Sequence, residues 1–144
     1  RTRKVWMSYA GDISVEDAWR ILGEDAAAQL VDVRTQAEWN FVGLPDLSKV
    51  QKAVLRVEWQ GFPGGAPNAQ FSDQVAATGA KPTDPILFLC RSGGRSKAAA
   101  IAQTGAGYSK CYNIAGGFEG DLDGDGHRGR VRGWKSAGLP WNQT

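Results

Sequence analysis

The sequence predicts an α/β fold with a central, mainly parallel sheet flanked by helices. Short runs of apolar and β-branched residues alternate with segments of helical pattern along the 144 residues, the order expected when strands and helices alternate in a parallel sheet. The run Ile86–Leu89 is wholly apolar, as is typical of a strand buried on both faces. The length fits one hydrophobic core, so we expect residues 1–144 to form one domain.

The first half of the chain predicts two helices and two strands. Ser14 is a candidate N-cap with Asp17 three residues later, a variant of the capping box. The helix that follows has an apolar face of Ala18, Trp19, Ile21 and Leu22. The other elements expected here are a strand over 28–33, a short helix over 36–40 capped by Thr35, and a strand over 53–57.

The second half predicts one aromatic loop, two helices and two strands. In chain order these are a Gly- and Pro-rich loop over 59–67, a helix over 68–78, a strand over 86–90, a helix over 96–105 and a strand over 111–114. Ligands of parallel sheets bind at the carboxyl ends of the strands. Asp32, Arg34 and Cys90 all lie at the carboxyl ends of predicted strands, so we expect them at one edge of the sheet.

Charge and hydropathy exclude two classes of partner. The net charge is +2, with 17 basic and 15 acidic residues, which is too balanced for a nucleic-acid-binding domain. Basic residues at 1–4 and 128–135 are interpreted as solvated surface. No apolar run approaches the roughly 20 residues of a membrane span, so we expect a soluble protein with no membrane partner. The compartment stays open, with the cytoplasm slightly favoured over the periplasm.

The segment from Cys90 to Ser96 is the most informative part of the chain. Cys90 ends a buried strand, and Arg91, Ser92, Gly93, Gly94, Arg95 and Ser96 follow it before a predicted helix. Two glycines let the backbone curl so that its amides point inward, while the arginines and the helix N-terminus add positive charge. These surroundings favour a thiolate and predict a nucleophile that handles sulfur or phosphorus.

The other metal-ligating and thiol groups are assigned no chemistry. Cys111 lies within a strand without a glycine loop and is interpreted as structural. Two cysteines outside a CxxC pair and a single histidine, His127, predict no disulfide framework and no zinc site. Residues 121–126 match the opening of a calcium loop, but Arg132 stands where a bidentate Glu is needed. We therefore expect Asp–Arg contacts in a surface loop, and neither a metal nor a cofactor.

Aromatic residues flank the loop that runs from 59 to 67. Trp59 and Phe62 either pack into the core or wall the mouth of the pocket at Cys90 and help to select the molecule that reacts there. The sequence leaves these two interpretations open.

An ordered set of motifs along the chain resembles the single-domain rhodanese-like sulfurtransferases. The segments that carry the resemblance are Ile13–Ala18, Leu30–Arg34 with Glu38, Cys90–Ser96, Gly107-Tyr108, Asn113, Gly116–Phe118, Gly133-Trp134 and Ala137–Pro140. Each is weak alone, and their order makes the set specific. The resemblance implies a rhodanese-like fold over residues 1–144.

The resemblance also implies a chemistry. Cys90 would take the outer sulfur of a donor such as thiosulfate, become a persulfide, and pass that sulfur to cyanide, a small thiol or a protein thiol. The amides of Ser92 to Ser96 would cradle the sulfur, and Arg91 and Arg95 would orient the anionic donor. Asp32 and Arg34 would support the loop as an ion pair.

Two alternatives remain beside sulfur transfer. Cysteine phosphatases of the cell-cycle type resemble rhodaneses in fold, but their loop is one residue longer than the four residues between Cys90 and Arg95, and no Asp stands where their general acid is needed. Other rhodanese-like domains are non-catalytic or regulatory binding modules, although those usually lack the cysteine.

Overall fold

The computed structural model describes residues 8–143 and contains a five-stranded sheet in the order β1-β6-β5-β2-β4. All four neighbouring pairs in this sheet are parallel. The strands are β1 (Gly11–Ile13), β2 (Gln29–Asp32), β4 (Leu55–Arg56), β5 (Ile86–Leu89) and β6 (Cys111–Ile114). The predicted α/β class with a mainly parallel sheet is confirmed.

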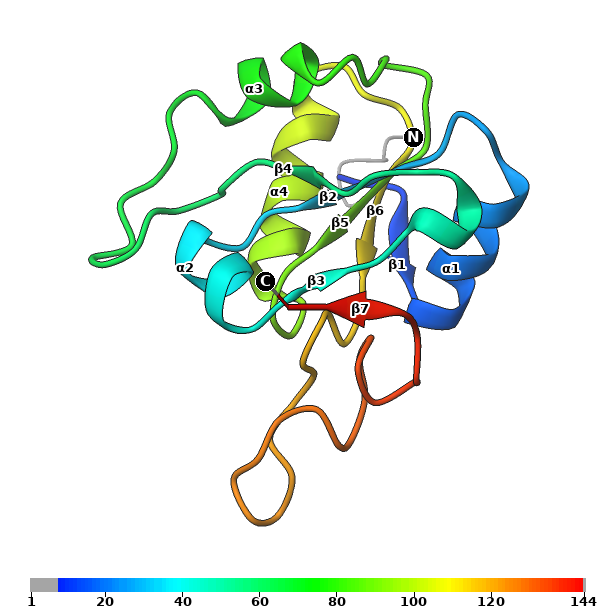
Figure 1. Cartoon of the computed structure of the whole chain (residues 1–144). Helices are drawn as coiled ribbons and strands as arrows, with labels where there is room; N and C mark the ends of the chain where they lie inside the picture. The colour runs from blue at the N-terminus through cyan, green and yellow to red at the C-terminus, as the bar shows by residue number, and fades with distance from the viewer. Residues whose placement is uncertain (1–7, 144) are drawn as a thin grey trace, which may run out of the picture.

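Helices cover both faces of the sheet (Figure 1). They are α1 (Val15–Glu24), α2 (Gln36–Phe41), α3 (Phe71–Ala77) and α4 (Gly94–Gly105), with a 3₁₀ turn η1 (Ser48–Val50). A separate antiparallel pair joins β3 (Leu44–Pro45) to β7 (Trp141–Asn142), so that a segment near the carboxyl end returns to the region just after α2.

The core has one cluster on each face of the sheet. On one face Phe88 and Val31 pack with Phe71 of α3 and Ala99 of α4. On the other face Leu30, Leu87 and Leu89 pack with α1 and with Trp134. Alternate residues of β2 and β5 thus face opposite layers, which explains why β5 is wholly apolar and why the two middle residues of β2 are apolar.

Two predicted N-caps are confirmed. The Ser14 side chain accepts a hydrogen bond from the Asp17 amide at 3.0 Å. Thr35 and Glu38 form a complete capping box at the start of α2. Both caps set the direction in which the chain leaves a strand at the carboxyl edge of the sheet.

Some boundaries differ from the sequence prediction. Residues 11–13, to which no element was assigned above, form a strand that pairs with β6. Helix α4 begins at Gly94, two residues before the expected start, and α3 begins at Phe71 because the Asn68 side chain binds the Gln70 amide in a turn. The antiparallel pair β3–β7 was not predicted, since two-residue strands carry no periodic pattern.

No helix within residues 8–143 combines the length and apolar character needed to span a bilayer. The basic residues at 1–4 lie outside the described residues.

Candidate active site

Cys90 lies at the carboxyl end of the central strand β5, directly before the loop that opens α4. Its neighbours in the sheet are β2 and β6, so polar side chains that follow those strands surround it. The residue is 1% exposed. The structure thus brings the predicted cysteine to the edge of the sheet where ligands of parallel folds bind.

Two groups approach the sulfur. The Gly93 amide donates a hydrogen bond to Sγ at 3.1 Å, and Oγ of Ser96 lies 3.1 Å from Sγ. Gly93 has a φ of 121°, a conformation open to glycine and strained for other residues. Among the described amides of the expected cradle, that of Gly93 is the one within hydrogen-bond distance of the sulfur.

A chain of polar side chains continues from Ser96 away from the sulfur. Oγ of Ser96 lies 2.6 Å from Oδ1 of Asn113, and Nδ2 of Asn113 donates to Oδ1 of Asp12 at 3.0 Å. The Tyr9 hydroxyl donates to the same carboxylate oxygen at 2.8 Å. Ser96 and Asn113 are buried, whereas Asp12 is exposed.

Arg95 forms a bidentate ion pair with Glu38 of α2. The Nη1–Oε1 and Nη2–Oε2 distances are 2.7 and 2.9 Å. Burial acts to raise the pKa of Glu38, but the hydrogen bonds from Arg95 outweigh burial and lower this pKa to about 2. The same hydrogen bonds raise the pKa of Arg95. One of the two predicted loop arginines is therefore held by a carboxylate beside the cysteine loop.

Asp32 and Arg34 form a second ion pair that is completely buried. Nη2 of Arg34 lies 2.7 Å from Oδ2 of Asp32 and also donates to the Gly43 carbonyl at 2.7 Å. The Arg34 guanidinium stacks on Phe118 at 4.3 Å from the ring centroid. This geometry is the ion pair expected from the sequence, and it ties β2 to the segment that follows β6.

The segment 117–120 packs against the cysteine loop and hydrogen-bonds to its backbone. The Phe118 amide donates to the Cys90 carbonyl at 2.8 Å, and the Glu119 and Gly120 amides donate to the Arg91 carbonyl, both at 3.0 Å. Gly117 has a φ of 62°, and a Cβ there would lie 2.5 Å from the Cys90 carbonyl oxygen. The close approach of these two backbones thus requires glycine at this position.

A cleft of about 650 Å³ adjoins the cysteine loop. Its walls come from α2, from the loop over 60–65 and from the segment after β6, and both Arg91 and Arg95 line it. Phe41 and Phe62, which are 78% and 71% exposed, also line it. Of the two aromatic residues considered for the pocket mouth, Phe62 is there, whereas Trp59 packs edge-on against Phe71 in the core.

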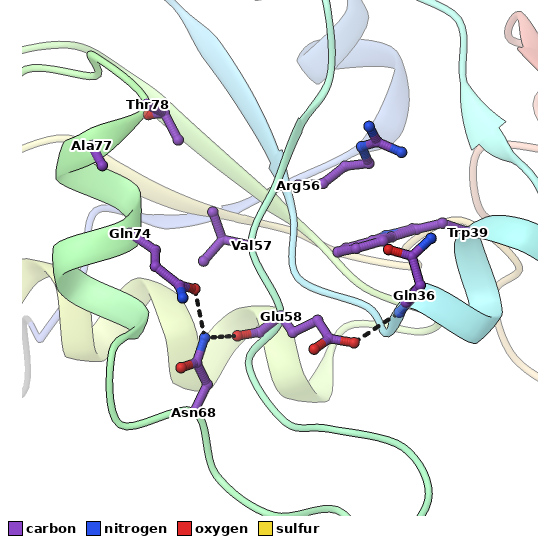
Figure 2. Close-up of a pocket in the computed structure, with 9 residues that line it drawn as sticks. All are labelled: Gln36, Trp39, Arg56, Val57, Glu58, Asn68, Gln74, Ala77 and Thr78. Carbon is purple, nitrogen blue, oxygen red and sulfur yellow. Dashed lines mark hydrogen bonds between the residues drawn. The ribbon is translucent and has the colours of Figure 1, made fainter.

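A second cleft of about 520 Å³ lies along the edge strand, between α2 and α3. Figure 2 shows that several of its lining residues hydrogen-bond to one another. Asn68 donates to the Glu58 carbonyl and to Gln74, and a Glu58 carboxylate oxygen accepts from the Gln36 amide. No lining residue comes from the segment 90–96, so the cleft beside the cysteine loop is the better candidate for chemistry.

The remaining groups of interest lie apart from the sulfur. Cys111 is buried within β6, and burial raises its pKa to about 11. His127 is exposed in the long loop that leaves the body of the protein after β6 (orange in Figure 1). In that loop Asp123 accepts from the amides of Asp125 and His127 and lies 3.6 Å from Arg130. The expected Asp–Arg contacts are confirmed.

A parallel sheet with a cysteine loop at the carboxyl end of its central strand is the arrangement expected of the rhodanese-like fold. A family model described as the STR4 middle domain matches residues 10–144. Because that match covers nearly the whole sequence, the chain belongs to this family.

Known proteins agree with this assignment. An uncharacterised protein of Rickettsia conorii is 40% identical over 125 residues, which are 86% of this chain and 90% of the relative. The chloroplast protein THYLAKOID RHODANESE-LIKE of Oryza sativa is 30% identical over 91% of this chain and 25% of its own length. Thiosulfate sulfurtransferase 18 of Arabidopsis thaliana is 34% identical over 62% of this chain and 63% of its own length.

A solved structure has the same fold at higher identity. The crystal structure of a Mycobacterium tuberculosis protein superposes with a TM-score of 0.87 and 48% identity, covering 94% of this chain and 99% of that one. The rhodanese-like fold expected from the sequence is therefore shown.

Sequence reasoning assigned no role to three residues that organise the site from neighbouring elements. Glu38, Asn113 and Gly117 belong to the motifs noted above, but nothing in their local pattern says what they touch. One signal was available for Asn113, a polar side chain near the carboxyl end of an otherwise buried strand. Such residues often face the ligand edge of a parallel sheet.

Proposed function

We propose that this protein is a sulfurtransferase in which Cys90 carries sulfane sulfur as a persulfide. The observation that carries the proposal is the position of Sγ, 3.1 Å from the Gly93 amide, at the carboxyl end of β5 and behind a cleft lined by arginines. The rhodanese-like relatives support the class of reaction. Thiosulfate and cyanide are the donor and acceptor we would use first.

The reaction consists of two displacements at sulfur. The Cys90 thiolate attacks the outer sulfur of thiosulfate, an Sγ–S bond forms, and the S–S bond of the donor breaks with its electron pair leaving on sulfite. The acceptor then attacks the terminal sulfur. The Sγ–S bond breaks and its electron pair returns to Cys90, which yields thiocyanate from cyanide or a new persulfide from a thiol.

The charges near the sulfur suit an anionic donor. The Gly93 amide and the start of α4 stabilise negative charge on the cysteine. Within residues 8–143, Arg91 and Arg128 line the cleft without a carboxylate partner within salt-bridge distance, whereas Arg95 is paired with Glu38. We therefore assign donor attraction first to Arg91 and Arg128, and placement of the loop to Arg95.

The exposed aromatic residues suit the acceptor. Phe41 and Phe62 offer apolar contact at the mouth of the cleft, which cyanide does not need and a larger organic or protein thiol can use. Sulfur acceptance by such a thiol is part of the proposed function.

A thiosulfate:cyanide assay tests the proposal. Wild type and Cys111→Ser should form thiocyanate, and Cys90→Ser should not, because Cys111 lies within β6 and its pKa is raised to about 11. Mass spectrometry after thiosulfate alone should find one added sulfur, about 32 Da, on Cys90. Equal thiocyanate formation by wild type and Cys90→Ser would overturn the proposal.

A further inference from the structure

The polar side chains beside Cys90 fix the orientation of the Asn113 amide. Burial acts to raise the pKa of Asp12, but the hydrogen bonds from Tyr9 and Asn113 hold this pKa below its ordinary value. Asp12 is therefore ionised at neutral pH and can only accept hydrogen bonds. The NH₂ group of Asn113 must face Asp12, 3.0 Å away. This leaves the amide oxygen of Asn113 facing Ser96.

Ser96 has one hydroxyl hydrogen and two neighbours that could accept it. Its Oγ lies 2.6 Å from Oδ1 of Asn113 and 3.1 Å from Sγ of Cys90. An amide oxygen cannot donate, so the 2.6 Å hydrogen bond requires the hydrogen of Ser96. Sγ then faces lone pairs of Oγ, a contact that suits a thiol donating S–H and opposes a thiolate.

We propose that Asn113 and Asp12 are positioning residues that turn the Ser96 hydroxyl away from the sulfur and so hold Cys90 as a thiol at rest. As in the proposed function, Cys90 is the nucleophile. The Gly93 amide donates to Sγ, but for the Ser96 hydroxyl to stabilise the thiolate as well, it must turn toward Sγ and leave the oxygen of Asn113 without a partner. Asn113 is only 4% exposed, so losing that hydrogen bond is costly.

Charged groups from several elements lie around this site, and all of them are retained in the Ser96 and Asn113 variants used below. They are Arg95 on α4, Glu38 on α2, Asp32 with Arg34 after β2, Arg91 and Glu119 at the loop, and Asp12 with Lys97 and Arg132 beyond Asn113. Since Asn113 and Ser96 are uncharged, replacing them tests hydrogen-bond direction without changing this field.

The test is the pH profile of Cys90 alkylation by iodoacetamide. Asn113→Leu keeps the approximate shape of the side chain and removes the acceptor, so the freed hydroxyl can donate to the thiolate. We expect the midpoint of the alkylation pH profile to move to lower pH. The alkylation rate at pH 7 should rise by about tenfold. Ser96→Ala alone should leave the midpoint unchanged or lower it, and adding Asn113→Leu to Ser96→Ala should have no further effect.

Two results would overturn the proposal. If Ser96→Ala moves the midpoint to higher pH, the hydroxyl already donates to sulfur in the resting protein. If Asn113→Leu lowers the midpoint equally with and without Ser96, its effect does not pass through the hydroxyl. Gln103→Leu is the matched control, because it also replaces a buried side-chain amide, here on α4, and that amide has no hydrogen-bond partner among the described residues. Its profile should match wild type.

The exposed residue Asp12 provides a second variant if Asn113→Leu does not fold, as judged by circular dichroism. Asp12→Asn lets either end of the Asn113 amide face position 12, so the midpoint should again fall, and fall less in the Ser96→Ala background. An equal fall in both backgrounds would be a charge effect alone and would reject the positioning role. Alkylation needs no sulfur donor, so an absence of sulfur transfer would leave this test intact.

Discussion

Glu38 and Arg95 join two helices across the mouth of the cysteine loop. Both guanidinium Nη atoms bind the carboxylate, at 2.7 and 2.9 Å, and the same Glu38 side chain completes the capping box with Thr35. One carboxylate therefore sets the start of α2 and the position of a loop arginine. The ion pair links the stability of the fold to the geometry around Cys90.

Replacing Glu38 with Gln should make the free energy of unfolding less dependent on pH in the acidic range. Gln can still serve in a capping box, so the variant isolates the ion pair. The folded pKa is about 2 against an ordinary 4.5, so the stabilisation is complete above about 4.5 and is lost as the pH falls toward 2. In urea unfolding, the variant should be less stable than wild type by about 1–2 kcal/mol at pH 7. This difference in stability should shrink toward pH 2. A gap that does not change with pH would contradict this origin.

Replacing Gly117 with Ala should disrupt the cysteine loop. The new Cβ would lie 2.5 Å from the Cys90 carbonyl oxygen and 2.6 Å from the Arg91 carbonyl, so one backbone has to move. We expect a loss of about 2–4 kcal/mol in thermal unfolding and a fall in sulfur transfer larger than the lost stability explains. Gly124→Ala is the control, because a Cβ at 124 has open space. Equal behaviour of the two variants would refute the tight approach.

Breaking the pair of Asp32 and Arg34 should cost more than removing it completely. Arg34→Met leaves the Asp32 carboxylate buried without its partner, and we expect a loss of roughly 3–5 kcal/mol. The double variant Asp32→Leu/Arg34→Met should lose less stability than the sum of the losses in the two single variants. Denaturant unfolding of all four proteins measures the coupling, and simple additivity would mean that the pair does not act as a unit.

Replacing Phe62 with Ala should weaken the binding of large sulfur acceptors without affecting small ones. The side chain is 71% exposed, so stability should change by less than about 0.5 kcal/mol. We expect KM for an organic thiol acceptor to rise severalfold while cyanide kinetics stay unchanged. Leu122→Ala, which also removes an exposed apolar side chain but lies outside the cleft, serves as the control. An unchanged KM for every thiol tried would remove Phe62 from acceptor binding.

The sequence was most informative where the physics is local. The apolar run Ile86–Leu89 and the cap at Thr35 depend on near neighbours, so strand β5 and helix α2 were predicted close to their observed bounds. The Cys90 loop was also found from local pattern, since glycines and arginines adjoin the cysteine in sequence.

The sequence was least informative where partners are distant in the chain. Arg95 is adjacent to the cysteine loop, but its ion pair with Glu38 spans 57 positions. The Asn113–Asp12 hydrogen bond spans 101 positions. Such contacts follow from the strand order β1-β6-β5-β2 and from parallel register, which no short pattern specifies.

The hydrogen bonds from residues 118–120 to the carbonyls of Cys90 and Arg91 have a consequence for biosynthesis. A nascent chain that has emerged only as far as β6 already contains the thiol and the whole segment Cys90–Ser96. It does not yet contain the amides that hold the carbonyl side of that segment. During translation, which adds residues from the N-terminus onward, the nucleophile is therefore made before its support. Its final geometry is reached only after the segment beyond β6 has left the ribosome.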